Sequence, residues 1–243
     1  MSTPRTRATT AAARPLVAGL AGLAAVAVLL GLTGCSAGGQ APSASPRQTL
    51  TAVKRNLDRT SGVHILLATD DLPTGVSGVL SADGVGTHAP AFQGDIRVKA
   101  SGLAANAKVI AVGGTVYAVL PFTSRYEQIN PADYGAPDPA ALMSSTSGLS
   151  SLLTSARHAA RGKQTRDGAR VLSTYTATVP GKQVATIIPS ASASGTFDAT
   201  FTVDDHNVLD KAVLTGPFYP KSGDVTYTIT FSDYGTKKHI TAP

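Results

Sequence analysis

Cysteine, tryptophan and glutamate are nearly absent from this chain of 243 residues, which has one cysteine, Cys35, and no tryptophan. A single cysteine excludes an internal disulfide and a metal site made of several thiolates. Glu127 is the only glutamate, so no pair of glutamates is available for acid–base catalysis. These absences exclude disulfide-stapled folds, thiolate-rich metal sites and hydrolases that use two glutamates.

Residues that could form a reaction centre are scattered along the chain. Helix capping and solvent exposure explain the serines of 144–151, for which His158 is the only nearby base. The five histidines lack the i, i+4 spacing of a helical zinc site. The run Asp204-Asp205-His206-Asn207 could in principle ligate a metal ion, but four polar residues between two apolar strands are more typical of a hairpin turn. We therefore predict that the protein is not an enzyme and uses neither a metal ion nor a cofactor.

Charge gives little indication of a partner. The chain has 21 lysines and arginines against 15 acidic residues, and three of the basic residues lie in its first 34 positions. The others form no basic run with interleaved aromatics, so we expect no nucleic-acid partner. Arg125, Lys221, Lys237 and Lys238 could neutralise lipid phosphates, with an ordinary solvated surface as the alternative.

The long apolar run of the chain lies near its N-terminus and ends in Leu32-Thr33-Gly34-Cys35. Residues 16–32 are almost wholly Ala, Val, Leu and Gly, and arginines precede them. This pattern is typical of a lipoprotein signal peptide, so we expect 1–34 to be cleaved and Cys35 to carry diacylglyceryl and palmitate-type acyl groups. Two acyl chains anchor a protein stably, at about 0.8 kcal/mol per buried methylene. The predicted location is the outer face of the cytoplasmic membrane, with a membrane-spanning anchor as the alternative.

The rest of the chain divides into a stalk and one domain. Residues 35–46 contain the lipidated N-terminus and a Ser/Gly/Pro-rich segment without large apolar side chains, which predicts a flexible stalk. Residues 47–243 are enough for a single domain with one core. Apolar residues at helical spacing predict a first helix over 48–59, and further short helices are expected within 138–156 and 180–188.

Between these helices the apolar period shortens toward two. Turn signals such as Asp83-Gly84, Gly113-Gly114, Asp167-Gly168 and Ser222-Gly223-Asp224 punctuate short β-branched runs. The predicted strands are 63–70, 75–82, 91–100, 105–112, 115–120, 125–129, 159–166, 169–178, 195–203, 207–215 and 224–232. So many strands at hairpin spacing predict an α+β fold: a large curved antiparallel sheet, or half-barrel, wrapped around a few helices.

A curled sheet of this kind can enclose a hydrophobic pocket between its apolar face and the helices. Small inward residues such as Ala100, Ala107, Ala111, Ala118 and Ala199 would leave space there, although an ordinary close-packed core is the alternative. Alternation along the strands and helices predicts the lining residues. These candidates are Ile96, Val98, Val109, Leu149, Leu152, Leu153, Val184, Ile187, Phe197, Phe201 and Ile229.

Several segments resemble one family. The motif ending at Cys35, the Ser61-Gly62-Val63-His64 strand entry, Gly94-Asp95-Ile96-Arg97-Val98, Gly114-Thr115-Val116-Tyr117-Ala118 and Ser232-Asp233-Tyr234-Gly235 together resemble the mycobacterial LppX/LprAFG lipoprotein family, and within it LprG-like carriers. The chain departs from that pattern in 103–106 and 218–223 and in having no tryptophan.

The resemblance implies a half-open sheet with a pocket for acyl chains of triacylglycerol, phosphatidylinositol mannoside or lipoglycan. It also implies transport between the cytoplasmic membrane and the outer envelope. The expected partners are the lipid, the membrane that holds Cys35, and a membrane lipid exporter. A structural or signalling lipoprotein that binds another envelope protein, with a packed core and no ligand, is the competing hypothesis.

Overall fold

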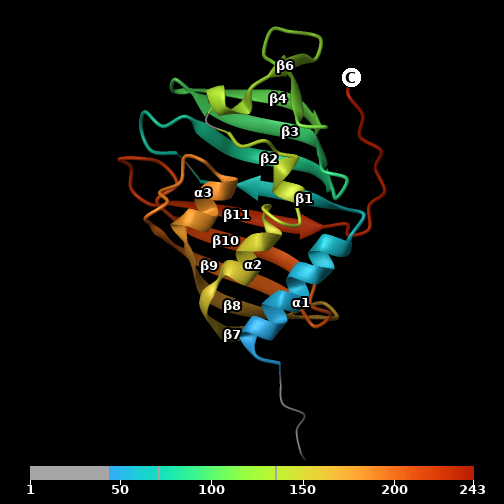
Figure 1. The fold of residues 1–243 in the computed structure, drawn as a ribbon, viewed down its shortest axis with the longest axis vertical. Coiled ribbons are helices and arrows are strands. Elements are labelled where there is room, and N and C mark those ends of the chain that lie inside the picture. The colour runs from blue at the N-terminus through green and yellow to red at the C-terminus, as the bar shows by residue number, and fades with distance from the viewer. Residues whose placement is uncertain (1–43, 71, 135) are drawn as a thin grey trace, which may run out of the picture. The chain divides into compact units, whose positions relative to one another are not determined.

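Eleven strands pair side by side in one antiparallel sheet, in the order β6-β5-β4-β3-β2-β1-β11-β10-β9-β8-β7 (Figure 1). The computed structural model describes residues 44–70, 72–134 and 136–243. Each of the eleven predicted strands overlaps an observed one. The strands are β1 (Gly62–Ala68), β2 (Gly78–Thr87), β3 (Ala91–Ala100), β4 (Leu103–Val112), β5 (Thr115–Val119), β6 (Glu127–Ile129), β7 (Arg157–Asp167), β8 (Arg170–Pro180), β9 (Thr196–Asp204), β10 (Leu209–Gly216) and β11 (Val225–Ser232).

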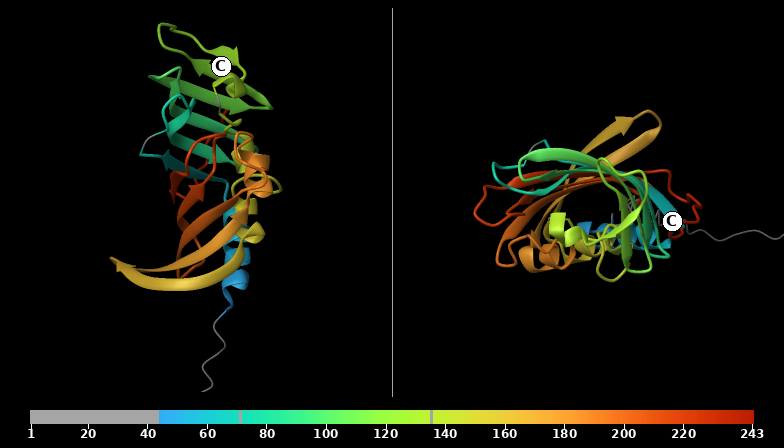
Figure 2. Two further views of the ribbon diagram at one scale, coloured as in Figure 1. Left: turned by 90° about the vertical axis from the view of Figure 1, so that its left-hand side faces the viewer. Right: turned by 90° about the horizontal axis from the view of Figure 1, so that it is seen from above.

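The strand order explains why one segment of the chain crosses the whole sheet. The two edge strands, β6 and β7, are consecutive in the sequence, so the chain between them must cross the full width of the sheet. This crossing segment, 130–156, carries two 3₁₀ turns and a short helix: η1 (Pro131–Tyr134), η2 (Ala141–Met143) and α2 (Ser150–Ser155). Figure 2 shows the sheet curving around these elements and the other helices. The predicted half-barrel wrapped around a few helices is confirmed.

Helix α1 (Pro46–Arg59) begins two residues before its predicted start because its N-terminus is capped on both sides. The Ser45 hydroxyl accepts a bond from the Gln48 backbone N–H, and the Gln48 side chain accepts one from the Ser45 N–H. Leu50, Val53 and Leu57 are buried against the sheet side. Together with α2 and α3 (Gly181–Ile187), α1 covers the part of the concave face built by β7 to β11 (Figure 1).

Along each strand, apolar and polar side chains alternate, and the apolar ones face the interior. On β9, Phe197, Ala199 and Phe201 are buried, whereas Asp198 is exposed. Phe197 also packs edge to face against Phe218, with ring centroids 4.8 Å apart. The part of the concave face around β9 is therefore filled by closely packed side chains.

The predicted turn at Asp83-Gly84 is wrong, because both residues lie inside β2. Gly84 pairs with Gly94 of β3, and a Cβ on Gly84 would lie 2.6 Å from Cζ of Phe92 and 2.6 Å from the Gln93 carbonyl oxygen. The glycine at this position allows a close approach of the Phe92 ring within a strand. An Asp-Gly pair indicates a turn only when the chain has to reverse there.

The segment 138–156 forms two short helical pieces and not one helix. The Ser144 hydroxyl accepts bonds from the backbone N–H groups of Thr146 and Ser147, which offers the chain an alternative to helical bonding. Beyond this turn, the Leu149 N–H donates to the Leu142 carbonyl at 2.9 Å, so the chain closes a loop before α2 begins.

Some predictions concern the N-terminal part of the chain. The signal peptide 1–34, Cys35 and the stalk through residue 43 lie outside the residues that the structure describes. Among the residues that it does describe, every helix is too short or too polar to cross a bilayer.

Candidate functional site

The concave face of the sheet contains two adjoining apolar cavities. The first lies between strands β1, β2, β3, β10 and β11 and the helices α2 and α3, and it encloses about 1010 Å³ of space, including the part open to solvent. Its lining side chains are apolar except for two tyrosine hydroxyls. They are Ile65, Leu67, Val79, Ala82, Phe92, Ile96, Ala136, Pro137, Pro139, Leu142, Leu149, Leu152, Val184, Ile187, Ile188, Leu214, Phe218, Tyr219, Tyr227 and Ile229.

The second cavity continues the first toward the β6 edge. It encloses about 650 Å³, again including its open part, and lies between β3 to β6 and the start of the crossing segment. The residues that line only this cavity are Val98, Ala100, Ala105, Ala107, Val109, Val116, Leu120, Pro121, Ile129, Pro131 and Tyr134. Ile96, Ala136, Pro137 and Pro139 line both cavities, so the two spaces adjoin at this junction.

The junction is suited to apolar contents. Pro137 and Pro139 have no N–H group, so this stretch places two fewer backbone donors beside the cavity. Across from them, Ile96 belongs to β3, whose neighbouring side chains Asp95 and Arg97 are exposed on the other face of the sheet. Residues of opposite character alternate along the strand, and only the apolar set faces the cavities.

The polar groups of the first cavity satisfy one another. The Tyr219 hydroxyl donates to the Tyr227 hydroxyl at 2.7 Å, and the Tyr227 hydroxyl donates to the Val79 carbonyl oxygen at 2.8 Å. Burial, followed by the hydrogen bond between them, raises the pKa of Tyr227, and burial raises the pKa of Tyr219 as well. Both phenols therefore stay neutral, and the cavity wall carries no ionised side chain.

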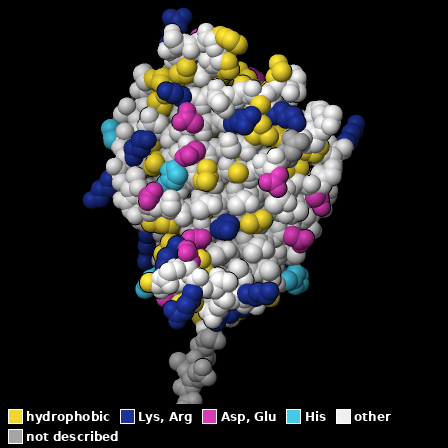
Figure 3. Space-filling view, turned by 180° about the vertical axis from the view of Figure 1, so that it is seen from behind, with side chains coloured by type: hydrophobic (Ala, Val, Ile, Leu, Met, Phe, Trp, Pro, Cys, Tyr) yellow, Lys and Arg dark blue, Asp and Glu magenta, His cyan; other side chains and the backbone are white. Residues whose placement is uncertain are grey.

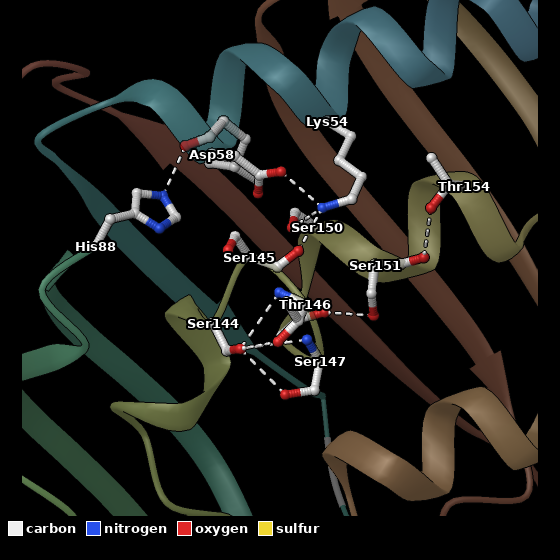
Figure 4. Close-up of polar contacts among 12 residues, drawn as sticks. Lys54, Asp58, His88, Ser144, Ser145, Thr146, Ser147, Ser150, Ser151 and Thr154 are labelled. Atoms are coloured by element: carbon white, nitrogen blue, oxygen red, sulfur yellow. Dashed lines mark hydrogen bonds and ion pairs between the residues drawn. The ribbon is translucent and has the colours of Figure 1, made fainter.

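Lys54 fastens the crossing segment to helix α1 (Figure 4). Its ammonium donates to the Asp58 carboxylate at 2.6 Å, to the Ser145 carbonyl oxygen at 2.6 Å and to the Ser150 hydroxyl at 3.2 Å. His88 makes a further bond at 2.7 Å to the carbonyl oxygen of Leu57 in the same helix. Since Leu142 and Leu149 lie on either side of this serine-rich turn, the contacts hold the cavity wall in place.

The structure brings most of the predicted lining residues to the cavities. Ile96, Leu149, Leu152, Val184, Ile187 and Ile229 line the first cavity, and Ile96, Val98 and Val109 line the second. Ala100 and Ala107 also line the second cavity. That these residues contact a lipid remains a prediction.

Three predicted lining residues lie elsewhere. Leu153, Phe197 and Phe201 are buried in the main core and line neither cavity. They belong to α2 and β9, and each lies among the buried side chains of the main core. Ala111, Ala118 and Ala199 are likewise buried without lining a cavity.

The prediction also missed several lining residues. Tyr227 shares the alternating pattern of Ile229, so that pattern could have revealed it. Phe218 and Tyr219 come from the loop between β10 and β11, and the proline-rich stretch 136–139 comes from the crossing segment. Periodicity gives no signal in such loops, and only the folded arrangement shows that they turn inward.

Polar groups elsewhere take other roles. His64 lies 3.2 Å from the Ser232 hydroxyl and 2.6 Å from the Asp83 carboxylate. Since the adjacent Ile65 lines the cavity, this cluster lies on the outer face, where charged side chains of both signs are scattered (Figure 3). The cluster links β1 to β2 and β11.

The other polar residues considered from the sequence are the Asp204-Asp205-His206-Asn207 run and the basic side chains near the cavities. Asp204 accepts backbone bonds from His206 and Val208, which confirms the predicted hairpin turn. Within 44–70, 72–134 and 136–243, no three His, Cys, Asp or Glu side chains are grouped so as to hold a metal ion. Arg125 follows Leu120 and Pro121 of the second cavity, and Lys221 follows Tyr219 of the first.

Comparison with known proteins agrees with this geometry. The model of the LppX_LprAFG lipoprotein family matches residues 45–240. The crystal structure of LprF from Mycobacterium bovis is similar with a TM-score of 0.63 and 16% identity, over 82% of this chain and 96% of that one. The crystal structure of lipoprotein LppX from Mycobacterium tuberculosis is similar with a TM-score of 0.58 and 16% identity, over 81% of this chain and 98% of that one. No curated protein matches the sequence.

Proposed function

Because the chain belongs to the LppX/LprAFG lipoprotein family, we propose that it is a membrane-anchored lipid carrier that performs no catalysis. Its two cavities bind the acyl chains of a lipid or glycolipid of the triacylglycerol, phosphatidylinositol mannoside or lipoglycan type. It carries this cargo between the cytoplasmic membrane and the outer cell envelope. Cys35 holds the protein on the outer face of the membrane, where a lipid exporter would supply the cargo.

The continuous apolar lining of the two adjoining cavities is the observation that carries this proposal. Apolar side chains line the first cavity except for two tyrosine hydroxyls, and apolar side chains together with Tyr134 line the second cavity, which adjoins it. An ionised or strongly polar ligand would find no charged partner on these walls. Each methylene of an acyl chain, in contrast, gains about 0.8 kcal/mol on leaving water.

The junction at Ile96 favours a cargo with more than one chain or with a long chain. A single short fatty acid in the first cavity would leave the second cavity empty. A lipid with several acyl chains would occupy both spaces and leave its polar head at an opening.

The proposal is tested on the full chain, purified in detergent and released from it in a mass spectrometer. We expect a stoichiometric non-covalent lipid, which organic solvent extracts and whose class a denaturing spectrum identifies. An acyl group covalently bound to Cys35 stays with the protein in solvent, so it is distinguished from cargo. A protein that is empty and fails to take up added diacyl or triacyl lipid would contradict the proposal and favour the protein-binding alternative.

A further inference from the structure

Two large apolar side chains project into solvent at the β4–β6 end of the sheet. Leu103 is 76% exposed and Phe122 is 108% exposed. Within the described part of the chain, Leu66 on β1 is the one other exposed large hydrophobic side chain, at 43%. Figure 3 shows apolar side chains gathered at this end of the molecule. We name the pair Leu103 and Phe122 the apolar tip.

The backbone presents each of these side chains outward on a tight turn. Ser101 and Gly102 both have positive φ, which forms a two-residue hairpin between β3 and β4 and places Leu103 at its foot. On the other turn, the Thr123 N–H donates to the Leu120 carbonyl at 3.1 Å, with Pro121 and Phe122 between them.

Phe122 occupies a position that normally belongs to glycine. Its φ is +68°, and a turn with proline second and positive φ third has the pattern of type II, where glycine or asparagine is usual. A phenylalanine in this conformation carries backbone strain and, being fully exposed, gains nothing from packing. Neither folding nor solubility explains the choice, so the side chain has to be explained by something that it contacts.

The apolar tip stands beside the opening of the second cavity. Leu120 and Pro121, which precede Phe122, line that cavity together with Ala100 and Ala105, which flank the Leu103 turn. These four lining residues are partly or wholly exposed, so the cavity opens between the two turns. One charged pair lies near the opening: Arg125 is 86% exposed three residues after Phe122, and its Nε lies 4.0 Å from the Glu127 carboxylate.

We propose that the apolar tip inserts into a phospholipid bilayer and places the opening of the second cavity against its acyl chains. Exposed aromatic and aliphatic side chains bind membranes by burying their apolar surface at the boundary between headgroups and acyl chains. The inference rests on the proposed lipid-carrier function, because an acyl chain that passes from the bilayer directly into the cavity is not exposed to water. The apolar walls of the cavity that opens beside the tip favour a lipid surface, which supplies acyl chains, over a groove in another protein.

The absence of native tryptophan supplies a direct test. Phe122→Trp in the full chain, reconstituted in vesicles of phosphatidylcholine and phosphatidylglycerol, gives one emission signal at the apolar tip. We expect its emission to shift to shorter wavelength and to fall at least twofold when the lipids carry brominated acyl chains. His206→Trp is the matched control, since that side chain is 83% exposed on the β9–β10 turn, and its emission should stay unshifted and unquenched. Emission from Phe122→Trp that is equally unquenched would overturn the proposal and point to a protein partner.

A second variant separates membrane insertion from folding. Phe122→Gly relieves the positive φ, so we expect it to raise the melting temperature while it slows lipid uptake from vesicles about tenfold. Uptake at the wild-type rate by this variant would refute the role of the apolar tip. Bound lipid is extracted from the same preparations. Quenching without extractable lipid would support insertion of the apolar tip and contradict the carrier function. Extractable lipid without quenching would support the carrier function and contradict insertion of the tip.

Discussion

Narrowing the junction between the two cavities should weaken the binding of long or multiple acyl chains. Ile96 lines both cavities, and a tryptophan there adds about six non-hydrogen atoms at the point where they adjoin. If the indole displaces about four methylenes of a bound chain, the loss is about 3 kcal/mol at 0.8 kcal/mol per methylene. Such a loss corresponds to a dissociation constant raised about a hundredfold.

The assay for Ile96→Trp is equilibrium binding of a pyrene-labelled phosphatidylcholine, with the melting temperature measured alongside. Because the new side chain enters open space, we expect the fold to keep its stability. Arg97→Trp is the matched control, since its side chain lies on the exposed face of the same strand and should leave binding unchanged. A folded Ile96→Trp protein that binds the probe with the wild-type constant would refute the assignment of the junction.

Three further predictions concern the elements around the cavities. Lys54→Met removes three hydrogen bonds and leaves the half-buried Asp58 carboxylate unpaired, so it should lower the free energy of unfolding by about 1–3 kcal/mol in urea titrations. Arg55→Ala, at an exposed position of the same helix, should leave this free energy unchanged. Equal effects of the two substitutions would contradict the fastening role of Lys54. Gly84→Ala should lower the free energy of unfolding in urea by about 1–3 kcal/mol, because the new Cβ would collide with the Phe92 ring. Gly223→Ala is the control and should have no effect, because a Cβ at that position meets open space. The buried Tyr219, Tyr227 and Tyr234 have pKa values raised above the ordinary 10.0, so the native state holds these protons more tightly than the unfolded state. The stabilisation from these protons is complete below pH 10 and is lost as the pH rises above it, which thermal unfolding at increasing pH will show. The loss of stability at alkaline pH should be smaller in Tyr227→Phe. An unchanged loss would count against the raised pKa of Tyr227.

Much of the sheet could be predicted from the sequence because its signals are local. Alternation along β9 and β11 shows which residues face inward, and turns such as Gly113-Gly114, with positive φ at both glycines, mark where strands reverse. The prediction failed at Asp83-Gly84, where the same residue types serve a close approach inside a strand. Composition cannot distinguish the two uses, since the difference lies in the Phe92 ring that packs there.

The boundary between core and cavity was less predictable. Phe201 and Ile229 both point to the concave face, yet one is enclosed by packed neighbours and the other lines an open space. Which of them meets a helix depends on where the crossing segment passes over the sheet. That path is fixed by contacts between distant parts of the chain, such as Lys54 with Ser145 and Ser150, and period-two patterns contain no information about it.

A crystal structure of the full chain purified with its native cargo tests the central claim most directly. The account predicts continuous electron density for an acyl chain that starts in the first cavity, near Tyr227 and Ile229, passes Ile96 and continues toward Val109 in the second. It further predicts that the polar head lies at an opening and outside the apolar walls. Cavities closed by their own side chains, in a protein from which no lipid can be extracted, would contradict it.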